Sequence, residues 1–284
     1  MNILSFGDII WDVYPEKSCI GGAMLNFAAH IAKSGADSFL MSSVGNDALG
    51  KDALDKLKQF NVNTKYISTN KELPTGQCRV TLDENAVPSF CLLDDVAYDE
   101  IKVSSDALGE NFDAIAFGSV PIRHSHNIQE LKRLIENGNA GKIYCDINLR
   151  EPFFNNDSVA FCLEIPNILK VSEVELEYIM KNVLSSDEND YEKSARALCK
   201  AFPNLELVLI TCGEDGAYVY SKEEDKTYYH PSKKVMVVST VGAGDSFGAA
   251  FLVDYLSGKS IEECLITATE RSAYVVSHID AVPN

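Results

Sequence analysis

The sequence predicts an α/β fold in which a mainly parallel sheet is covered by helices on both faces. Short apolar runs that end at Gly, Ser or Asn alternate with amphipathic segments along most of the 284 residues. Runs that are apolar throughout are typical of strands buried on both faces of a parallel sheet. Apolar residues make up 46% of the chain and charged residues 24%, as in an ordinary globular domain. In such sheets ligands bind beyond the carboxyl ends of the strands, where these small polar residues gather.

The elements follow in order along the chain. Strands are predicted for the apolar runs at 2–7, 38–45, 113–119, 142–148, 167–172, 205–213 and 234–240. Helices are predicted where apolar residues recur at helical spacing, at 23–34, 48–60, 127–136, 191–201 and 247–256. The connections between the parallel strands are expected to be right-handed crossovers.

Two segments break this alternation. Residues 75–95 contain two β-rich arms around the turn residues DENA, and residues 11–15 are β-like directly after the first strand. We therefore expect a β-flap made of segments 11–18 and 74–98, inserted in a single domain of residues 1–284. A flap beside a cleft can act as a lid that excludes water. Its open edge and apolar face predict a homodimer built through it.

Composition excludes several classes of partner. Asp plus Glu number 42 and Lys plus Arg 25, so the formal net charge is −17, and no basic tract offsets it. This charge repels a phosphate backbone, so nucleic acid is not an expected partner. No run approaches the ~20 apolar residues of a membrane span, and the N-terminus lacks the features of a signal peptide. The eight cysteines occur singly, which favours a reducing, cytoplasmic location.

The segment VGAGDSFGAA at 241–250 combines three small residues, a carboxylate and the start of a helix-like run. Without bulky side chains at Gly242, Ala243 and Gly244, successive backbone N–H groups can converge on one anion. An acid among these donors repels a resting phosphate, but it is suited to accept the proton of an attacking hydroxyl. Asp245 is therefore predicted to be a general base of phosphoryl transfer. The alternative, a helix-capping acid, does not account for the three small residues before it.

Two other nucleotide-binding motifs fit the sequence less well. GNDALGKD at 45–52 resembles a phosphate loop, but it ends at Asp52, which has no hydroxyl for magnesium. The glycines of GAGDSFG resemble a dinucleotide fingerprint, but that motif needs a further strand ending in an acid about 20 residues later. The corresponding region lies inside the helical pattern SIEECLITATERSAYVV, so the dehydrogenase interpretation is rejected.

Two segments resemble the two signatures of one family, and the resemblance extends over essentially the whole chain. STVGAGDSFGAAF at 239–251 resembles the C-terminal signature of the ribokinase-like (pfkB-type) carbohydrate kinases. GGAMLNFAAHIAKSG at 21–35, followed by VGNDALGKDAL, resembles their N-terminal signature. The resemblance implies a three-layer α/β/α sandwich with a β-flap lid, ATP and Mg²⁺ as co-substrates, and phosphorylation of a sugar hydroxyl. It also implies that Asp245 is the catalytic base and that the three small residues before it form the anion hole.

The resemblance also assigns a sugar site. The family positions that hold the sugar hydroxyls match four residues of this chain: Asp12, Gly21, Gly22 and Asn26. A neutral polyol needs carboxylate and amide groups that orient its hydroxyls, beside glycines that allow close approach.

A nucleotide site and a metal-linked site follow from the same resemblance. TCGEDGAYVY resembles the family's nucleotide-contacting segment and places three residues near ATP: Thr211, Gly213 and Gly216. VSEVELEYI lies where the family carries N-x-x-E, a motif linked to the magnesium and phosphate network. Glu175 matches this motif, and Ser172 replaces its asparagine but still offers a hydroxyl to a water shell.

Two further positions depart from the family pattern. Ser239 stands where many relatives carry the Asp associated with monovalent-cation activation, so a potassium site is not expected. Asp280 stands where a glycine is usual. His278 nearby is a candidate for the adenine pocket or for an ordinary surface residue.

The sugar is assigned only by resemblance. CDINLREPFF at 145–154 carries the D-x-N-x-R pattern of fructokinases and 2-keto-3-deoxygluconate kinases. A sugar acid needs a positive partner, which Arg150, Arg123 or Arg79 could supply, but the same arginines could serve ATP phosphates. We expect a fructokinase. The alternatives are a 2-keto-3-deoxygluconate kinase, a ribokinase, and a non-catalytic sugar- or nucleotide-binding protein on the same fold.

Overall fold

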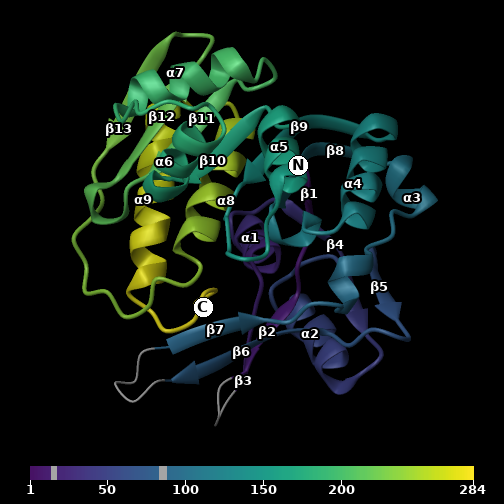
Figure 1. The fold of residues 1–284 in the computed structure, drawn as a ribbon. Coiled ribbons are helices and arrows are strands. Elements are labelled where there is room, and N and C mark those ends of the chain that lie inside the picture. The colour runs from purple at the N-terminus through teal and green to yellow at the C-terminus, as the bar shows by residue number, and fades with distance from the viewer. Residues whose placement is uncertain (14–17, 83–87) are drawn as a thin grey trace.

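The structure is a computed structural model that describes residues 1–13, 18–82 and 88–284 (Figure 1). Nine strands form its main sheet: β1 (Asn2–Phe6), β4 (Asp37–Gly45), β5 (Ile67–Asn70), β8 (Asn111–Gly118), β9 (Asn139–Asp146), β10 (Ile168–Ser172), β11 (Leu207–Thr211), β12 (Ala217–Ser221) and β13 (Lys226–His230). They lie side by side in the order β5-β4-β1-β8-β9-β10-β11-β12-β13. The strands from β5 to β11 run parallel, and β12 and β13 are added as an antiparallel edge.

Helices pack on both faces of this sheet. One face carries α1 (Ala23–Lys33), α2 (Ala48–Gln59), α8 (Ala243–Leu256) and α9 (Ile261–Val276). The other carries α3 (Ser105–Leu108), α4 (Ser125–Asn137), α5 (Asn156–Glu164), α6 (Glu173–Asn182) and α7 (Tyr191–Ala201). Three short 3₁₀ helices join these elements: η1 (Ala97–Glu100), η2 (Val120–Ile122) and η3 (Gly213–Asp215).

The central strands are largely apolar because both of their faces are covered. Ile3 and Tyr144 pack into the core that includes α1 and α8. The next residues along each strand, Leu4 and Cys145, pack into the core that includes α4 and α5. Neighbouring side chains of a strand point to opposite faces, so each strand serves two cores. The predicted three-layer α/β/α arrangement is confirmed.

Four strands form a second, separate sheet, which Figure 1 shows at one end of the molecule. They are β2 (Ile10–Val13), β3 (Ser18–Gly21), β6 (Gly76–Leu82) and β7 (Pro88–Leu92), in the order β3-β2-β6-β7. We call this the small sheet. Strands β2, β6 and β7 come from the two segments expected to form a β-flap, whereas β3 extends beyond the predicted limit at residue 18. Residues 14–17 and 83–87 of these segments lie outside the described residues. The action of the small sheet as a lid stays a prediction.

A minor core joins the small sheet to the body. Ile10 and Cys78 of the small sheet pack against Val96, Tyr98 and Val120. The ring of Tyr98 lies so close to Gly76 that a Cβ there would approach Tyr98 Cε1 to 2.6 Å. The small sheet is therefore anchored along β2 and β6, and Leu92 at the end of β7 also packs against this core.

The strand predicted at 234–240 is wrong. Residues 231–240 form neither helix nor strand. The N–H groups of Val238 and Ser239 both donate to the carbonyl oxygen of Val276, at 2.8 and 3.2 Å, near the end of α9. Met236 and Val237 remain 81% and 62% exposed. Apolar, β-branched composition suggested a strand, but this segment hydrogen-bonds to a helix end instead of to a sheet neighbour.

Among the helices of the described ranges, none has the length and apolar character needed to cross a bilayer.

Candidate active site

The first turn of α8 is built as an anion-binding turn. Gly242 has a left-handed backbone, with φ of 81°, and a Cβ at this position would lie 2.7 Å from the carbonyl oxygen of Ala281. Only glycine fits such a position without strain. No side chain within the described residues caps this turn. Of the three residues predicted to form the anion hole, Ala243 instead donates its N–H to the carbonyl oxygen of Thr240 at 3.3 Å. The N–H groups of Gly244 and Asp245 have no acceptor within the helix, so they are available to an anion, together with the positive end of the helix dipole.

Asp245 meets the predicted sugar site directly. Asn26 of α1 donates a hydrogen bond from Nδ2 to Asp245 Oδ2 at 2.9 Å. Burial, and then the negative charge of Asp146, raise the pKa of Asp245 to about 7, against the opposing effects of Asn26 and Lys170. A carboxyl group with a pKa near neutrality is suited to general acid–base work. A simple exposed helix cap would not have this environment.

A buried ion pair lies directly behind the anion-binding turn. Lys170 Nζ, near the end of β10, donates to both carboxylate oxygens of Asp146 at the end of β9, at 3.0 and 3.1 Å. A Cβ on Gly244 would lie 2.8 Å from Lys170 Nζ. The ammonium therefore occupies the space that any side chain at 244 would need. Sequence reasoning missed both charges as site residues, although each stands inside an apolar strand run, which is itself unusual.

The sugar-side residues gather where the small sheet meets α1. A Cβ on Gly21 would lie 3.2 Å from Asp12 Oδ2, so the carboxylate of Asp12 faces this glycine turn. Gly22 has φ of 106°, and a Cβ there would come within 2.6 Å of the carbonyl oxygen of Asp8. Burial, and then the charge of Asp8, raise the pKa of Asp12 to about 6. Asp12, Gly21, Gly22 and Asn26 are thus brought to one side of Asp245.

Asp8 explains why α1 begins where it does. Its carboxylate accepts hydrogen bonds from the N–H groups of Ala23 at 2.7 Å and Met24 at 3.3 Å. These are two of the otherwise unpaired donors of the first helical turn. Asp8 therefore holds the start of α1 next to the GG turn, and Asn26 is placed one turn into the helix.

The three nucleotide-site candidates line one cavity with the anion-binding turn. The cavity has a volume of about 130 Å³, and its lining includes Thr211, Gly213, Gly216, Ala243 and Gly244. It is smaller than the roughly 300 Å³ that a complete small-molecule pocket needs, so it fits part of a nucleotide, such as a phosphate group beside α8. The residues present fit ATP in this limited sense.

A larger cavity does not suit a phosphate. It has a volume of about 420 Å³ and lies between α6 and α7. Its lining includes Glu173, Glu177, Asp187 and Glu188. Carboxylates at these positions would repel an anionic ligand.

Ser172 and Glu175 start α6 through a reciprocal pair of bonds. Ser172 N donates to Glu175 Oε2 at 2.7 Å, and Glu175 N donates to Ser172 Oγ at 3.3 Å. Glu175 Oε1 also accepts from Leu149 N at 2.9 Å, which ties down the loop after β9. Each carboxylate oxygen keeps a free lone pair. The pair therefore fits Mg²⁺ held through water better than direct ligation.

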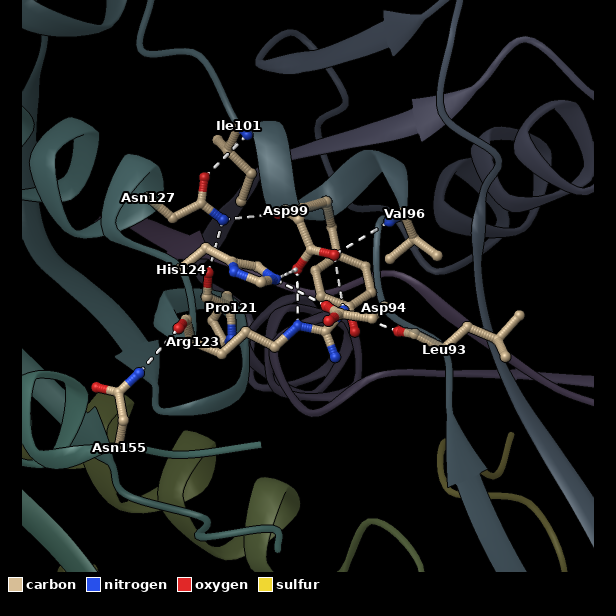
Figure 2. A network of polar contacts seen from close by, with 11 residues as sticks. Leu93, Asp94, Val96, Asp99, Ile101, Pro121, Arg123, His124, Asn127 and Asn155 are labelled. Carbon is tan, nitrogen blue, oxygen red and sulfur yellow. Dashed lines mark hydrogen bonds and ion pairs between the residues drawn. The ribbon is translucent and has the colours of Figure 1, made fainter. Parts of the chain in front are cut away.

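Arg123 is committed to an internal network (Figure 2). Its side chain is 3% exposed, and it donates to Asp99 through Nε at 2.8 Å and through Nη2 at 2.7 Å. Nη2 also donates to Leu93 O at 2.8 Å. His124 and Asp94 complete the cluster at its edge, with His124 Nε2 2.7 Å from Asp94 Oδ1. The guanidinium links the end of the small sheet to the body, so it is poorly placed to recognise a sugar acid.

The remaining candidate side chains have different surroundings. Arg79 and Arg150 are exposed. Burial raises the pKa of Asp146, and Arg150 is among the nearby cations that oppose this rise. Ser239 Oγ accepts from Val241 N at 3.3 Å, within the turn before α8. His278 donates from Nδ1 to Tyr274 O at 2.7 Å, and its ring lies against that of Tyr274 in a tilted arrangement, which accounts for its place after α9.

Comparisons with known proteins bear on the family and the fold of this chain. The family described as pfkB family carbohydrate kinase matches residues 16–283. Fructokinase from Solanum tuberosum is 30% identical over 288 residues, which cover 92% of this chain and 83% of that protein. ATP-dependent 6-phosphofructokinase from Thermoanaerobacterium thermosaccharolyticum is 28% identical over 290 residues, which cover 97% of this chain and 84% of that protein. The structure of an uncharacterized sugar kinase from Pyrococcus horikoshii in complex with ATP is similar, with a TM-score of 0.81 at 26% identity, covering 99% of this chain and 94% of that one.

Proposed function

Because this chain belongs to the pfkB family of carbohydrate kinases, which are ATP-dependent phosphotransferases, we propose that it transfers the γ-phosphoryl group of ATP to a hydroxyl of D-fructose. The observation that carries the proposal is the 2.9 Å contact between Asn26 and Asp245. It joins the predicted sugar site to a carboxyl group at the mouth of an uncapped helix N-terminus. The sugar hydroxyl that gives up its proton and the phosphoryl group bound at the helix N-terminus would therefore both lie beside the carboxylate of Asp245.

Asp245 acts as general base in this proposal. It takes the proton of the sugar hydroxyl while the oxygen forms its bond to the γ-phosphorus, and the bond to ADP breaks with its electron pair leaving on ADP. The N–H groups of Gly244 and Asp245 lie where the transferred group carries its negative charge. Such preorganised donors stabilise the transition state more than the ground state.

The sugar is oriented by polar groups on two elements. Asp12 from the small sheet accepts hydrogen bonds from hydroxyls, and Asn26 from α1 both donates and accepts. Gly21 and Gly22 let the sugar approach the backbone. Since Asp12 belongs to the small sheet, closure of that sheet would complete the sugar site and exclude water from the transfer.

The metal-linked residues play a supporting part. Mg²⁺, when bound, neutralises phosphate charge. We assign Ser172 and Glu175 to its water shell, because oxygen donors suit this ion and each group retains acceptor capacity. Thr211, Gly213 and Gly216 contact the nucleotide beside the anion-binding turn.

Fructose is preferred over three other substrates. The D-x-N-x-R segment and the fructokinase relatives support it. Arg150 is exposed near Asp146 and could instead bind the carboxylate of 2-keto-3-deoxygluconate. The 6-phosphofructokinase relative adds fructose 6-phosphate, whose phosphate would need a cation in the same place. Ribose remains the neutral alternative.

A coupled assay of ADP release tests these assignments. The chain would be supplied with ATP, Mg²⁺ and one sugar at a time: D-fructose, fructose 6-phosphate, 2-keto-3-deoxygluconate or D-ribose. We expect the highest kcat/KM with D-fructose. Arg150→Ala separates the classes, because its loss should weaken an anionic substrate strongly and fructose little. A higher kcat/KM for another sugar would overturn the choice of fructose while leaving the kinase activity in place.

A further inference from the structure

Lys170 is a buried cation in an unusual position. It belongs to β10, inside an otherwise apolar run, and it is 6% exposed. Its ammonium lies at the carboxyl end of the sheet, where a Cβ on Gly244 would approach Nζ to 2.8 Å. The ammonium thus lies against the backbone of the anion-binding turn, beside the cavity that Gly244 lines.

The surroundings keep this amine charged. Burial lowers the pKa of Lys170, but the charges of Asp146, Glu175 and Asp245 outweigh it, so the pKa is raised overall. Asp146 alone among the described residues accepts hydrogen bonds from Nζ, through both oxygens. An ammonium group has three N–H donors. One donor is therefore left over, on a group that faces both the general base and the anion-binding turn.

A purely structural role explains the pair poorly. Replacing a buried ion pair by apolar residues is often neutral or stabilising, so burial of two charges is weak evidence for stability. The neighbouring lysine of the sheet, Lys142 on β9, is half-buried and pairs with Glu206 near the surface. Lys170 differs because its charge is held below the turn where a phosphoryl group would carry its negative charge.

We propose that Lys170 is a catalytic residue, which contacts an oxygen of the transferring phosphoryl group through the space left by Gly244 and stabilises its charge. Asp146 is the positioning residue that holds the ammonium in place. Lys170 gives up no proton: the sugar proton goes to Asp245, the new bond joins sugar oxygen to phosphorus, and the electron pair of the broken bond stays on ADP. A fixed cation of this kind acts by electrostatic preorganisation. The inference rests on the proposed role of Asp245.

The position of Lys170 gives a second physical reason why residue 244 is glycine. A methyl group at this position would meet Lys170 Nζ within 3 Å and push the ammonium away from the turn. Gly244→Ala should therefore lose the same charge interaction as removal of the lysine. Combined with Lys170→Met it should cost little more than either change alone, because both remove one interaction.

The main test compares Lys170→Met with Lys142→Met as a matched control. We expect kcat of Lys170→Met to fall about 10²–10³-fold, the range seen when one preorganised donor is removed. The affinity for ADP with Mg²⁺ and aluminium fluoride, which mimics the transferring group, should fall by a similar factor. The affinity for ADP with Mg²⁺ alone should change less than about threefold, since this interaction belongs to the transition state. Lys142→Met should match the unchanged chain in all three measurements.

A second variant separates catalysis from folding. Lys170→Met leaves Asp146 buried without a partner, which alone can destabilise the chain. Lys170→Met combined with Asp146→Asn removes both charges. If the pair were structural, the double variant would recover both its melting temperature and its kcat, and that result would overturn the inference. Recovery of the melting temperature with kcat still low supports it.

Failure of the inference can be told from failure of the proposed function. If the unchanged chain phosphorylates a sugar and Lys170→Met keeps kcat within about threefold, Lys170 has no catalytic role and the proposed function stands. If the pH profile and the Asp245→Asn variant show that Asp245 is not the base, the proposed mechanism fails first. The comparison of ADP with and without aluminium fluoride still reports on Lys170 in that case, because it needs no turnover.

Discussion

His30 on α1 and Ala281 near the C-terminus are joined by a 2.9 Å hydrogen bond, which His30 Nε2 donates to the carbonyl oxygen of Ala281. The same carbonyl oxygen lies where it leaves no room for a side chain at Gly242. The C-terminal segment thus holds the turn that begins α8, and His30 holds that segment.

His30 should make stability depend on pH. Burial lowers the pKa of His30 from 6.5 to about 4, so between these values the unfolded chain binds a proton that the folded chain does not. Stability should therefore rise with pH from about 4 to 6.5 and be level above it. His30→Gln can keep a donor to Ala281 but cannot titrate. Urea unfolding at pH 5 and pH 8 should show a smaller gain for this variant, and an identical gain in both proteins would contradict the assignment.

Asp245→Asn should abolish most activity without harming the fold. Asparagine keeps the size of the side chain but cannot take a proton, so kcat should fall about 10²–10⁴-fold. Because burial raises the pKa of Asp245 from 3.8 to about 7, the free energy of unfolding should fall as pH rises from about 4 to about 7, and the whole loss is present at pH 8. The melting temperature of the variant at pH 8 should therefore equal or exceed that of the unchanged chain. Asp254→Asn, at the other end of α8, is the matched control. Near-normal kcat in Asp245→Asn would show that the acid is only a helix cap.

The rate should follow the titration of Asp245. A general base works only when deprotonated, so kcat should increase with pH around an apparent pKa of about 7 and be level above it. Asp146, Asp8 and Lys170 are the charged groups that shape this titration. Removing the hydrogen bond with Asn26→Ala should move the rise to higher pH, because that bond favours the charged form. The measurement is kcat at saturating sugar from pH 5.5 to 9, and a rise centred near pH 4 would rule out the assignment.

Turnover should not need added potassium. Ser239 has no carboxylate to hold a monovalent cation, and its hydroxyl accepts a hydrogen bond from Val241 N. Rates in sodium, potassium and Tris buffers of equal ionic strength should agree within about twofold. Strong activation by potassium alone would mean that backbone carbonyl groups suffice to bind the ion.

The small sheet should also support a homodimer. It has two open edges, β3 and β7, and an exposed strand edge is a template for pairing with another copy. Sedimentation at micromolar concentration should give about twice the mass of one chain. Substituting Arg79→Glu on β6, which is exposed in the small sheet, checks whether the association runs through this surface. A monomer at these concentrations would remove the prediction.

The fold and the centre of the site could be predicted because their signals are local. Apolar runs that serve two cores read as parallel strands, and the GAGD turn carries its small residues and its acid side by side. The same local pattern misled at 234–240, where β-branched residues lie exposed against the end of α9. The amino-acid composition shows which structures a segment can adopt. Which partner its backbone hydrogen-bonds to depends on residues far away in the sequence.

The rest of the site depends on contacts between distant segments. Lys170 and Asp146 stand on adjacent strands, and only the strand order places them behind Gly244. Arg123 looked available to a sugar acid, but its Nε and Nη2 groups donate to Asp99 and Leu93 inside the protein. Neither relationship has a spacing rule, so neither could be read from the sequence.

The two central strands of the small sheet, β2 and β6, are far apart in the sequence. They pair in parallel, with Ile10 opposite Gly76. In the sequence β3, α1, β4, α2 and β5 lie between these two strands. Closing so large a loop costs entropy that the intervening elements must first offset by folding. We therefore expect the small sheet to form late in folding, after the body of the molecule. The amide hydrogens of the small sheet should exchange with solvent faster than those of β1 and β8, so the part of the molecule proposed to cover the sugar should also be the part that opens first.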